Sequence, residues 1–164
     1  LQSLHTSDDE LTLLRSWILL VAQLFPQRTR SLHQAFATVI RLFGSSAGEV
    51  QECIVHRDFH EGQILVAPDR ATLIDFDTTC NGEAAQDIGN FLAHLDYAEA
   101  LNGPDATSDV AAFLSAYEKT HTPNSAARIR AYRTATLLRL SCIHAISTES
   151  RSVAESLTER ALLP

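Results

Sequence analysis

Charged and polar side chains stand between two apolar runs in the segment IVHRDFHEGQILV, which spans residues 54–66. A second acidic segment, LIDFDTT, begins at Leu73 and places Asp75 at the end of another apolar run. Carboxylates are rare in buried surroundings unless they are paired or bind a ligand. Asp58 and Asp75 are therefore the first candidates for chemistry in this chain.

The short apolar runs around these acids have the length and composition of β-strands. The segments QILVA and ATLIDF are separated by a turn led by Pro68, and we expect them to form a small antiparallel hairpin. Gln63, at the start of one strand, and Asp75, at the end of the other, then lie at the same end of the hairpin. Because the loop that carries Asp58 leads into Gln63, the oxygen atoms of these three side chains are predicted to converge.

Convergent oxygen ligands of this kind favour Mg²⁺ over zinc. A magnesium site with one or two protein ligands usually shares the ion with the phosphates of a substrate. A further carboxylate, such as that of Asp58, can accept a proton from an attacking hydroxyl group. A metal-binding acid beside a general base is the arrangement that phosphoryl transfer requires.

The segments HRDFHEGQILV and LIDFDTT resemble the catalytic and metal-binding segments of protein-kinase-like enzymes. Their spacing is closer to that of the aminoglycoside phosphotransferase and choline kinase group than to that of protein kinases. GEAAQDIGNFLAHL resembles the third segment of this group, in which an Asp opens a helix behind the active site. Three motifs in the right order, within residues 50–100, are far more specific than any one of them.

The resemblance implies a fold, an activity and cofactors. The fold would be that of a protein-kinase-like C-terminal lobe. The activity would be phosphorylation of a hydroxyl group on a sugar, an aminoglycoside or an amino alcohol, with ATP or GTP and Mg²⁺ as cofactors.

The resemblance also implies roles for individual residues. Asp58 would be the catalytic base, and Asp75 would hold the Mg²⁺ that bridges the nucleotide phosphates. Gln63 stands where the family more often has Asn, and it would be the other metal ligand, on a stem one methylene longer. His56 would pack under the loop and bond its backbone. Asp87 would brace the loop from the start of the next helix, as a structural residue.

Helices are predicted for most of the remaining chain. The spacing of apolar residues predicts two helices within residues 1–50, the catalytic loop and hairpin within 51–82, and a helical subdomain within 83–164. Ser7 is the predicted N-cap of the first helix and Gly44 the predicted C-cap of the second. The sequence therefore predicts a single α+β domain, predominantly helical, with one small antiparallel hairpin.

Kinases of this type also have an N-terminal lobe with a glycine-rich loop and a lysine that pairs with the nucleotide phosphates. Here the residues before the catalytic motif are predicted as helices, and the first lysine is Lys119. We therefore expect a C-terminal lobe without its nucleotide-binding lobe, with weak or no affinity for ATP alone. The start at Leu1 and the absence of methionine suggest that the sequence is a fragment.

Composition narrows the range of partners. The net charge of −7 argues against nucleic acid, and WILLVAQLF, the longest apolar run near the N-terminus, is too short to span a membrane. The three widely spaced cysteines predict neither a disulfide framework nor a zinc site, so a reducing, cytoplasmic location is expected. The predicted partners are a nucleotide, a small-molecule hydroxyl acceptor, and either a chain that supplies the N-terminal lobe or a second copy.

Two other functions stay open on the sequence. A non-catalytic kinase-like module or interaction subunit would keep the fold without turnover, and a Mg²⁺-dependent hydrolase would use the same acids.

The remaining polar side chains are predicted to be structural or solvated. His60 and Glu61 are expected to be solvated loop residues, on a loop that faces the substrate side. The histidines His94, His121 and His144 are too scattered in the sequence to predict a metal site. Four arginines of the long helix near the C-terminus are expected to form its solvated face, with recognition of an anionic acceptor as the alternative: Arg128, Arg130, Arg133 and Arg139.

Overall fold

The computed structural model describes residues 4–46, 52–103, 109–120, 125–148 and 150–163. The helices are α1 (Ser7–Leu24), α2 (Thr29–Ser45), α3 (Ala84–Asn102), α4 (Asp109–Thr120), α5 (Ala126–Ile146) and α6 (Arg151–Leu162). The strands are β1 (Glu52–Val55), β2 (Ile64–Ala67), β3 (Arg70–Leu73) and β4 (Cys80–Glu83), and the short 3₁₀ helices are η1 (Pro26–Arg28) and η2 (Glu61–Gln63). The prediction of a predominantly helical α+β fold is confirmed. None of the described helices is long and apolar enough to cross a bilayer.

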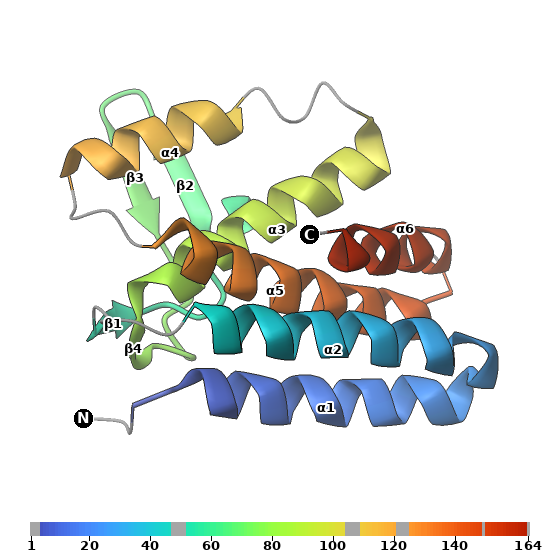
Figure 1. Cartoon of the computed structure of the whole chain (residues 1–164). Coiled ribbons are helices and arrows are strands. Elements are labelled where there is room, and N and C mark those ends of the chain that lie inside the picture. Colours follow the sequence, from blue (N-terminus) through green and yellow to red (C-terminus); the bar gives the residue numbers. More distant parts are fainter. Residues whose placement is uncertain (1–3, 47–51, 104–108, 121–124, 149, 164) are drawn as a thin grey trace.

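Helix α5 lies at the centre of the helical part of the molecule. It packs against α1, α2, α3 and α6, while the β2–β3 hairpin and α4 lie at one end of the bundle (Figure 1). Its buried residues lie on several sides of the helix, and they include Tyr132, Ala135, Leu138 and Cys142. A helix with neighbours on several sides has little surface left for a solvated face.

The prediction that the arginines of α5 are solvated is therefore wrong for Arg128 and Arg139, whose side chains are 13% and 18% exposed, and incomplete for Arg133, whose side chain is 39% exposed but paired. These three bind polar groups of β4 and α3: Arg128 binds the Glu83 carboxylate, Arg133 the Asp96 carboxylate and Arg139 the Asn90 amide oxygen. Glu83, Asp96 and Asn90 are all buried, and buried polar groups are stable only when they are paired. Arg130 is exposed, as expected.

Both helix caps differ from the sequence-based prediction. The N-cap of α1 is Thr6 rather than Ser7, because Thr6 Oγ1 accepts a hydrogen bond from the Asp9 amide at 3.3 Å. The Asp9 carboxylate in turn accepts from the Thr6 amide at 2.8 Å, which completes a capping box. Gly44 lies inside α2, whose C-cap is Ser46.

Strands β2 and β3 form the predicted antiparallel hairpin, with Ile64 opposite Leu73. The sequence did not predict β4, which pairs antiparallel with β1 in a second sheet and places Val55 opposite Cys80. The segment CNGE has no alternation of apolar and polar residues, so nothing local marks it as a strand. Its pairing depends on the chain returning to β1 after the hairpin.

Helices α3 and α5 approach each other closely at Gly89. A Cβ atom on Gly89 would lie 2.6 Å from Tyr132 Cβ and 2.7 Å from the backbone nitrogen of Arg133. The second atom belongs to the backbone of α5 and cannot turn aside as a side chain can. Gly89 therefore sets the distance between these two helices.

We predict that Gly89→Ala lowers the free energy of unfolding by about 1–3 kcal/mol, because the added methyl group forces the two helices apart. Gly44→Ala is the matched control, since a Cβ at this helical position meets nothing within 4 Å. That variant should be neutral or more stable by about 0.5–1 kcal/mol. Urea denaturation of both variants measures the difference. Equal stability of the two variants would show that the contact at Gly89 does not set the distance between α3 and α5.

Candidate active site

The side chains of Asp58, Gln63 and Asp75 meet at one end of the hairpin. Gln63 Nε2 donates to Asp58 Oδ2 at 3.2 Å and to Asp75 Oδ2 at 3.3 Å. The three residues come from different local structures: the loop after β1, the end of η2 and the segment after β3. The structure thus brings the three side chains together, but the atom of Gln63 that faces the two carboxylates is Nε2 rather than the predicted amide oxygen.

The hairpin register explains why Gln63 and Asp75 are neighbours. The ladder continues one step beyond the strands, since the Ile74 amide donates to the Gln63 carbonyl at 3.0 Å. Asp75 then adopts a left-handed backbone conformation, with φ 63°, and so does Arg57 just before Asp58, with φ 68°. Non-glycine residues rarely adopt this conformation, and such positions gather at functional sites. In this chain one of the two positions is Asp75 itself and the other directly precedes Asp58.

His56 links the loop to the segment that follows the hairpin. Its buried ring donates from Nε2 to the Ile74 carbonyl at 2.8 Å, directly before Asp75. Its own carbonyl accepts from Thr78 Oγ1 at 2.7 Å. The position of Asp75 relative to the loop is therefore fixed on both sides by His56, through its ring before Asp75 and through its backbone carbonyl after it.

Asp87, in the first turn of α3, accepts two hydrogen bonds from the loop. Its Oδ2 accepts from the His56 amide at 2.7 Å and its Oδ1 from the Arg57 amide at 2.8 Å. Burial raises the pKa of Asp87, and these two hydrogen bonds oppose that rise because they stabilise the carboxylate. Asp87 thus makes the contacts expected of a residue that holds the loop against the start of α3.

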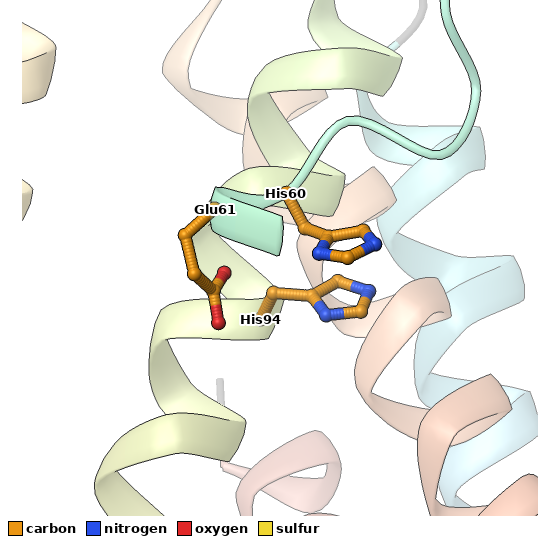
Figure 2. Close-up of side chains that lie close together, drawn as sticks. All are labelled: His60, Glu61 and His94. Carbon is orange, nitrogen blue, oxygen red and sulfur yellow. The ribbon is translucent and has the colours of Figure 1, made fainter. Parts of the chain in front are cut away.

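Further along α3, two residues that the sequence did not single out also hold the loop. Asn90 donates from Nδ2 to the Phe59 carbonyl at 2.9 Å. His94 stacks on His60, with ring centroids 4.5 Å apart and the planes 13° from parallel (Figure 2). With Asp87 they form a polar stripe at positions i, i+3 and i+7 on one face of the helix. That spacing, in a helix of mostly apolar residues, was the signal that could have revealed them.

The prediction that His60 is a solvated loop residue is wrong. Its side chain is only 23% exposed because it lies against His94. Its Nδ1 accepts from the Gly62 amide at 3.1 Å, and its Nε2 lies 3.8 Å from Asp58 Oδ2. Glu61 is exposed, as expected. His121 lies outside the described residues, so the prediction that it belongs to no metal site stays a prediction.

A cavity of about 390 Å³ adjoins the loop on the side of Phe59. It lies among β1, the end of β3, α3 and α4, and its walls are mostly apolar. Three aromatic side chains contribute to its wall: Phe59, Phe113 and Tyr117. The cavity is large enough to take part of a small molecule.

The charge at the meeting point suits a hard divalent cation. Among the described residues, no lysine or arginine forms an ion pair with Asp58 or Asp75. Two carboxylates and one amide therefore lie together with little compensating positive charge. Carboxylate and amide oxygens are the ligands that Mg²⁺ prefers, so the residue types fit this ion. Gln63 would bind it after its amide turns over, because its Nε2 rather than its oxygen now faces the two acids.

The sequence profile of the phosphotransferase enzyme family matches residues 3–135, which include the whole site. The chain belongs to this family. The resemblance drawn from the three motifs is thus confirmed. No curated protein and no solved structure matches the chain significantly.

Family membership makes phosphotransfer the chemistry to consider at this site. The roles of Asp58, Gln63, Asp75, His56 and Asp87 stay predictions, as does the identity of the phosphotransferase substrate. The geometry satisfies what those roles require: the acids meet, and the loop that carries Asp58 is held by both the hairpin and α3.

We predict that Asp87→Ala lowers the free energy of unfolding by about 1–3 kcal/mol, because it leaves the amides of His56 and Arg57 without their acceptor. Hydrogen exchange at these two amides should accelerate more than exchange in α5. Asp77→Ala is the control, because Asp77 is an exposed acid of the same region without a described partner. If both variants behave alike, Asp87 does not brace the loop.

Proposed function

We propose that the chain is the catalytic lobe of a small-molecule phosphotransferase. It would transfer the γ-phosphoryl group of ATP or GTP to a hydroxyl group on a sugar, an aminoglycoside or an amino alcohol. The observation that carries the proposal is the meeting of Asp58, Gln63 and Asp75, in a chain that belongs to the phosphotransferase enzyme family.

In this proposal Asp58 is the general base. Its side chain is 42% exposed, so an acceptor hydroxyl can reach it, and the carboxylate can take the hydroxyl proton as the oxygen attacks. The hydrogen bond from Gln63 Nε2 orients the carboxylate. The contacts that Asp87 and Asn90 make with the loop backbone hold Asp58 in place, and in phosphoryl transfer such positioning accounts for much of the catalysis.

Gln63 and Asp75 are the residues that would hold Mg²⁺. When bound, the ion would neutralise charge on the nucleotide phosphates, which is its usual contribution to phosphoryl transfer. Asp75 is exposed, which leaves it accessible to a nucleotide.

The acceptor is proposed to be cationic or rich in hydroxyl groups. Asp58 and Glu61 lie on the loop, and Asp75 and Asp77 follow the hairpin, so the surroundings of the base are acidic. The adjoining cavity supplies aromatic walls against which a sugar or an apolar part of the acceptor would pack. Both features support a small molecule as the acceptor.

We also propose that the described residues form the C-terminal lobe of a kinase-like fold. The described segment that precedes β1 consists mainly of α1 and α2. The hairpin exposes the apolar side chains of Val66 and Leu65, 81% and 57% exposed, and β1 exposes that of Ile54, 72% exposed. These side chains would contact a nucleotide-binding lobe, whether it belongs to the same chain or to another.

The same exposed side chains favour a second candidate function, that of a non-catalytic interaction subunit. Exposed apolar patches mark surfaces that bind other proteins. The two candidates differ in whether the acids at the end of the hairpin are needed for turnover.

We predict that Asp58→Asn lowers phosphoryl transfer about 10²–10⁴-fold, because the amide cannot accept the hydroxyl proton. The assay measures nucleotide consumption with a panel of aminoglycosides, sugars and amino alcohols. Asp77→Asn, which removes a neighbouring exposed charge, should retain activity. Activity that survives Asp58→Asn would exclude Asp58 as the base. The panel is run at millimolar nucleotide because the chain alone is expected to bind MgATP weakly, and only a chain that binds MgATP and still phosphorylates none of the panel favours the interaction subunit.

We further predict that this chain alone binds MgATP weakly or not at all, because the described residues provide only one side of a nucleotide cleft. Isothermal titration calorimetry of the chain with MgATP measures this directly. A dissociation constant in the micromolar range would contradict the assignment of the chain as a lobe that needs a partner.

A further inference from the structure

Beside Asp58, Gln63 and Asp75 lies a second cluster of polar side chains, which contains imidazoles as well as a carboxylate. His60, Glu61 and His94 each offer one ligand atom, and these atoms all lie within 4.8 Å of one another. His60 and Glu61 come from the loop and the start of η2, whereas His94 comes from α3, so the cluster joins two separate elements (Figure 2). The phosphoryl-transfer proposal gives Glu61 only a share in the acidic surroundings of the base, and it gives His94 only a contact that holds the loop.

His94 offers a free ring nitrogen. Within the described part of the chain its ring makes no hydrogen bond, and its stacking on His60 uses the face of the ring rather than its edge. A neutral imidazole with an unused lone pair is the form that binds metal ions.

The hydrogen bonds of His60 define which of its nitrogens can serve as a ligand. Nδ1 accepts from the Gly62 amide, so the ring proton lies on Nε2, which faces Asp58 Oδ2 at 3.8 Å. A metal-binding histidine usually directs its other N–H toward a carboxylate, which fixes the ring and raises its basicity. Nδ1 of His60 is therefore the metal-facing atom, and Asp58 is the carboxylate behind the ring.

Glu61 supplies the negative charge. Its carboxylate is exposed and forms no ion pair with any described residue. In Figure 2 it lies beside the edge of the stacked rings rather than pointing away from them. The carboxylate of Glu61 would supply negative charge to a cation bound there, and the nearby carboxylate of Asp58 adds to it against the positive charge of Arg139.

We propose that His60, Glu61 and His94 bind a divalent transition-metal ion of the zinc class, at a site distinct from the one for Mg²⁺. Two imidazoles and one carboxylate suit Zn²⁺ and its neighbours, whereas Mg²⁺ prefers oxygen ligands alone. Three protein ligands leave the fourth position of a tetrahedral zinc ion for water.

Binding requires a local rearrangement that the structure permits. Ligands of a tetrahedral zinc ion lie roughly 3.3 Å apart, given bonds of about 2.0 Å, and the ion lies in the plane of each ring. The two rings must therefore turn out of their stack, and the Gly62 amide must give up its contact with Nδ1. Glu61 is exposed and can move toward the ion.

Occupancy of this site would act on Asp58 through His60. An ion on His60 would add positive charge close to Asp58, whose Oδ2 lies 3.8 Å from His60 Nε2, and this charge would stabilise the Asp58 carboxylate and make it a weaker base. We therefore expect zinc to inhibit phosphoryl transfer. This consequence rests on the proposed function, whereas binding of the ion does not.

The test is calorimetric titration of the tag-free chain with ZnCl₂, in a Cys53→Ser background that removes a partly exposed thiol. The expected result is one zinc ion per chain. Co²⁺ in place of zinc should give the intense visible bands of a tetrahedral site. Mg²⁺, titrated at the same concentrations, should not displace the ion.

Matched variants assign the ligands. His94→Ala and Glu61→Gln should each weaken zinc binding by more than about 10-fold, as expected for the loss of a ligand. His33→Ala, which removes an exposed histidine on α2, should leave binding unchanged. Glu61 is exposed, so its variant tests the site even if His94→Ala fails to fold.

Three outcomes would overturn the proposal: no zinc binding below about 1 mM, binding that survives Glu61→Gln at full strength, or loss of binding in the His33→Ala control. Binding is measured without turnover, so it is independent of the activity assay. If zinc binds as expected while phosphoryl transfer survives Asp58→Asn, the metal site stands and the proposed role of Asp58 fails.

Discussion

The position of α3 against α5 governs the candidate site. Gly89 allows the two helices to approach until a Cβ would be 2.6 Å from a side-chain atom of Tyr132. At this separation the polar stripe of α3 reaches the loop in three places: Asp87 at its start, Asn90 in its middle and His94 at its end. The loop has little regular structure of its own, so its geometry is largely that of the helix behind it.

The bundle supports this helix through buried polar pairs as well as apolar packing. Arg139 of α5 donates to Asn90 Oδ1 at 2.6 Å, which leaves the Asn90 Nδ2 group directed at the loop carbonyl. Arg133 neutralises Asp96 further along the same helix. Such pairs add directional specificity to a contact, and their loss leaves uncompensated buried charge. The arginines of α5 thus orient groups that in turn orient the loop.

Much of this architecture could be predicted, because its signals are local. Helical spacing of apolar residues located the helices to within a few residues, and the turn at Pro68 fixed a register that brings Gln63 next to Asp75. Strand β4 could not be predicted, since its stability comes from a distant partner rather than its own composition. The same is true of the contact between His60 and His94, which depends on the direction of α3. Contacts that span several elements were the ones that sequence patterns missed.

The left-handed backbone at Arg57 has a consequence for protein engineering. A non-glycine residue with φ 68° costs roughly 1–2 kcal/mol, which glycine would avoid. Yet the positive charge of Arg57 lies near enough to act on the carboxylates of Asp9, Glu10 and Asp87, which belong to two different helices. Redesign guided by thermostability alone would select glycine at this position and would remove the cation that those acids share. The strained backbone of Arg57 therefore keeps a positive charge close to carboxylates of α1 and α3.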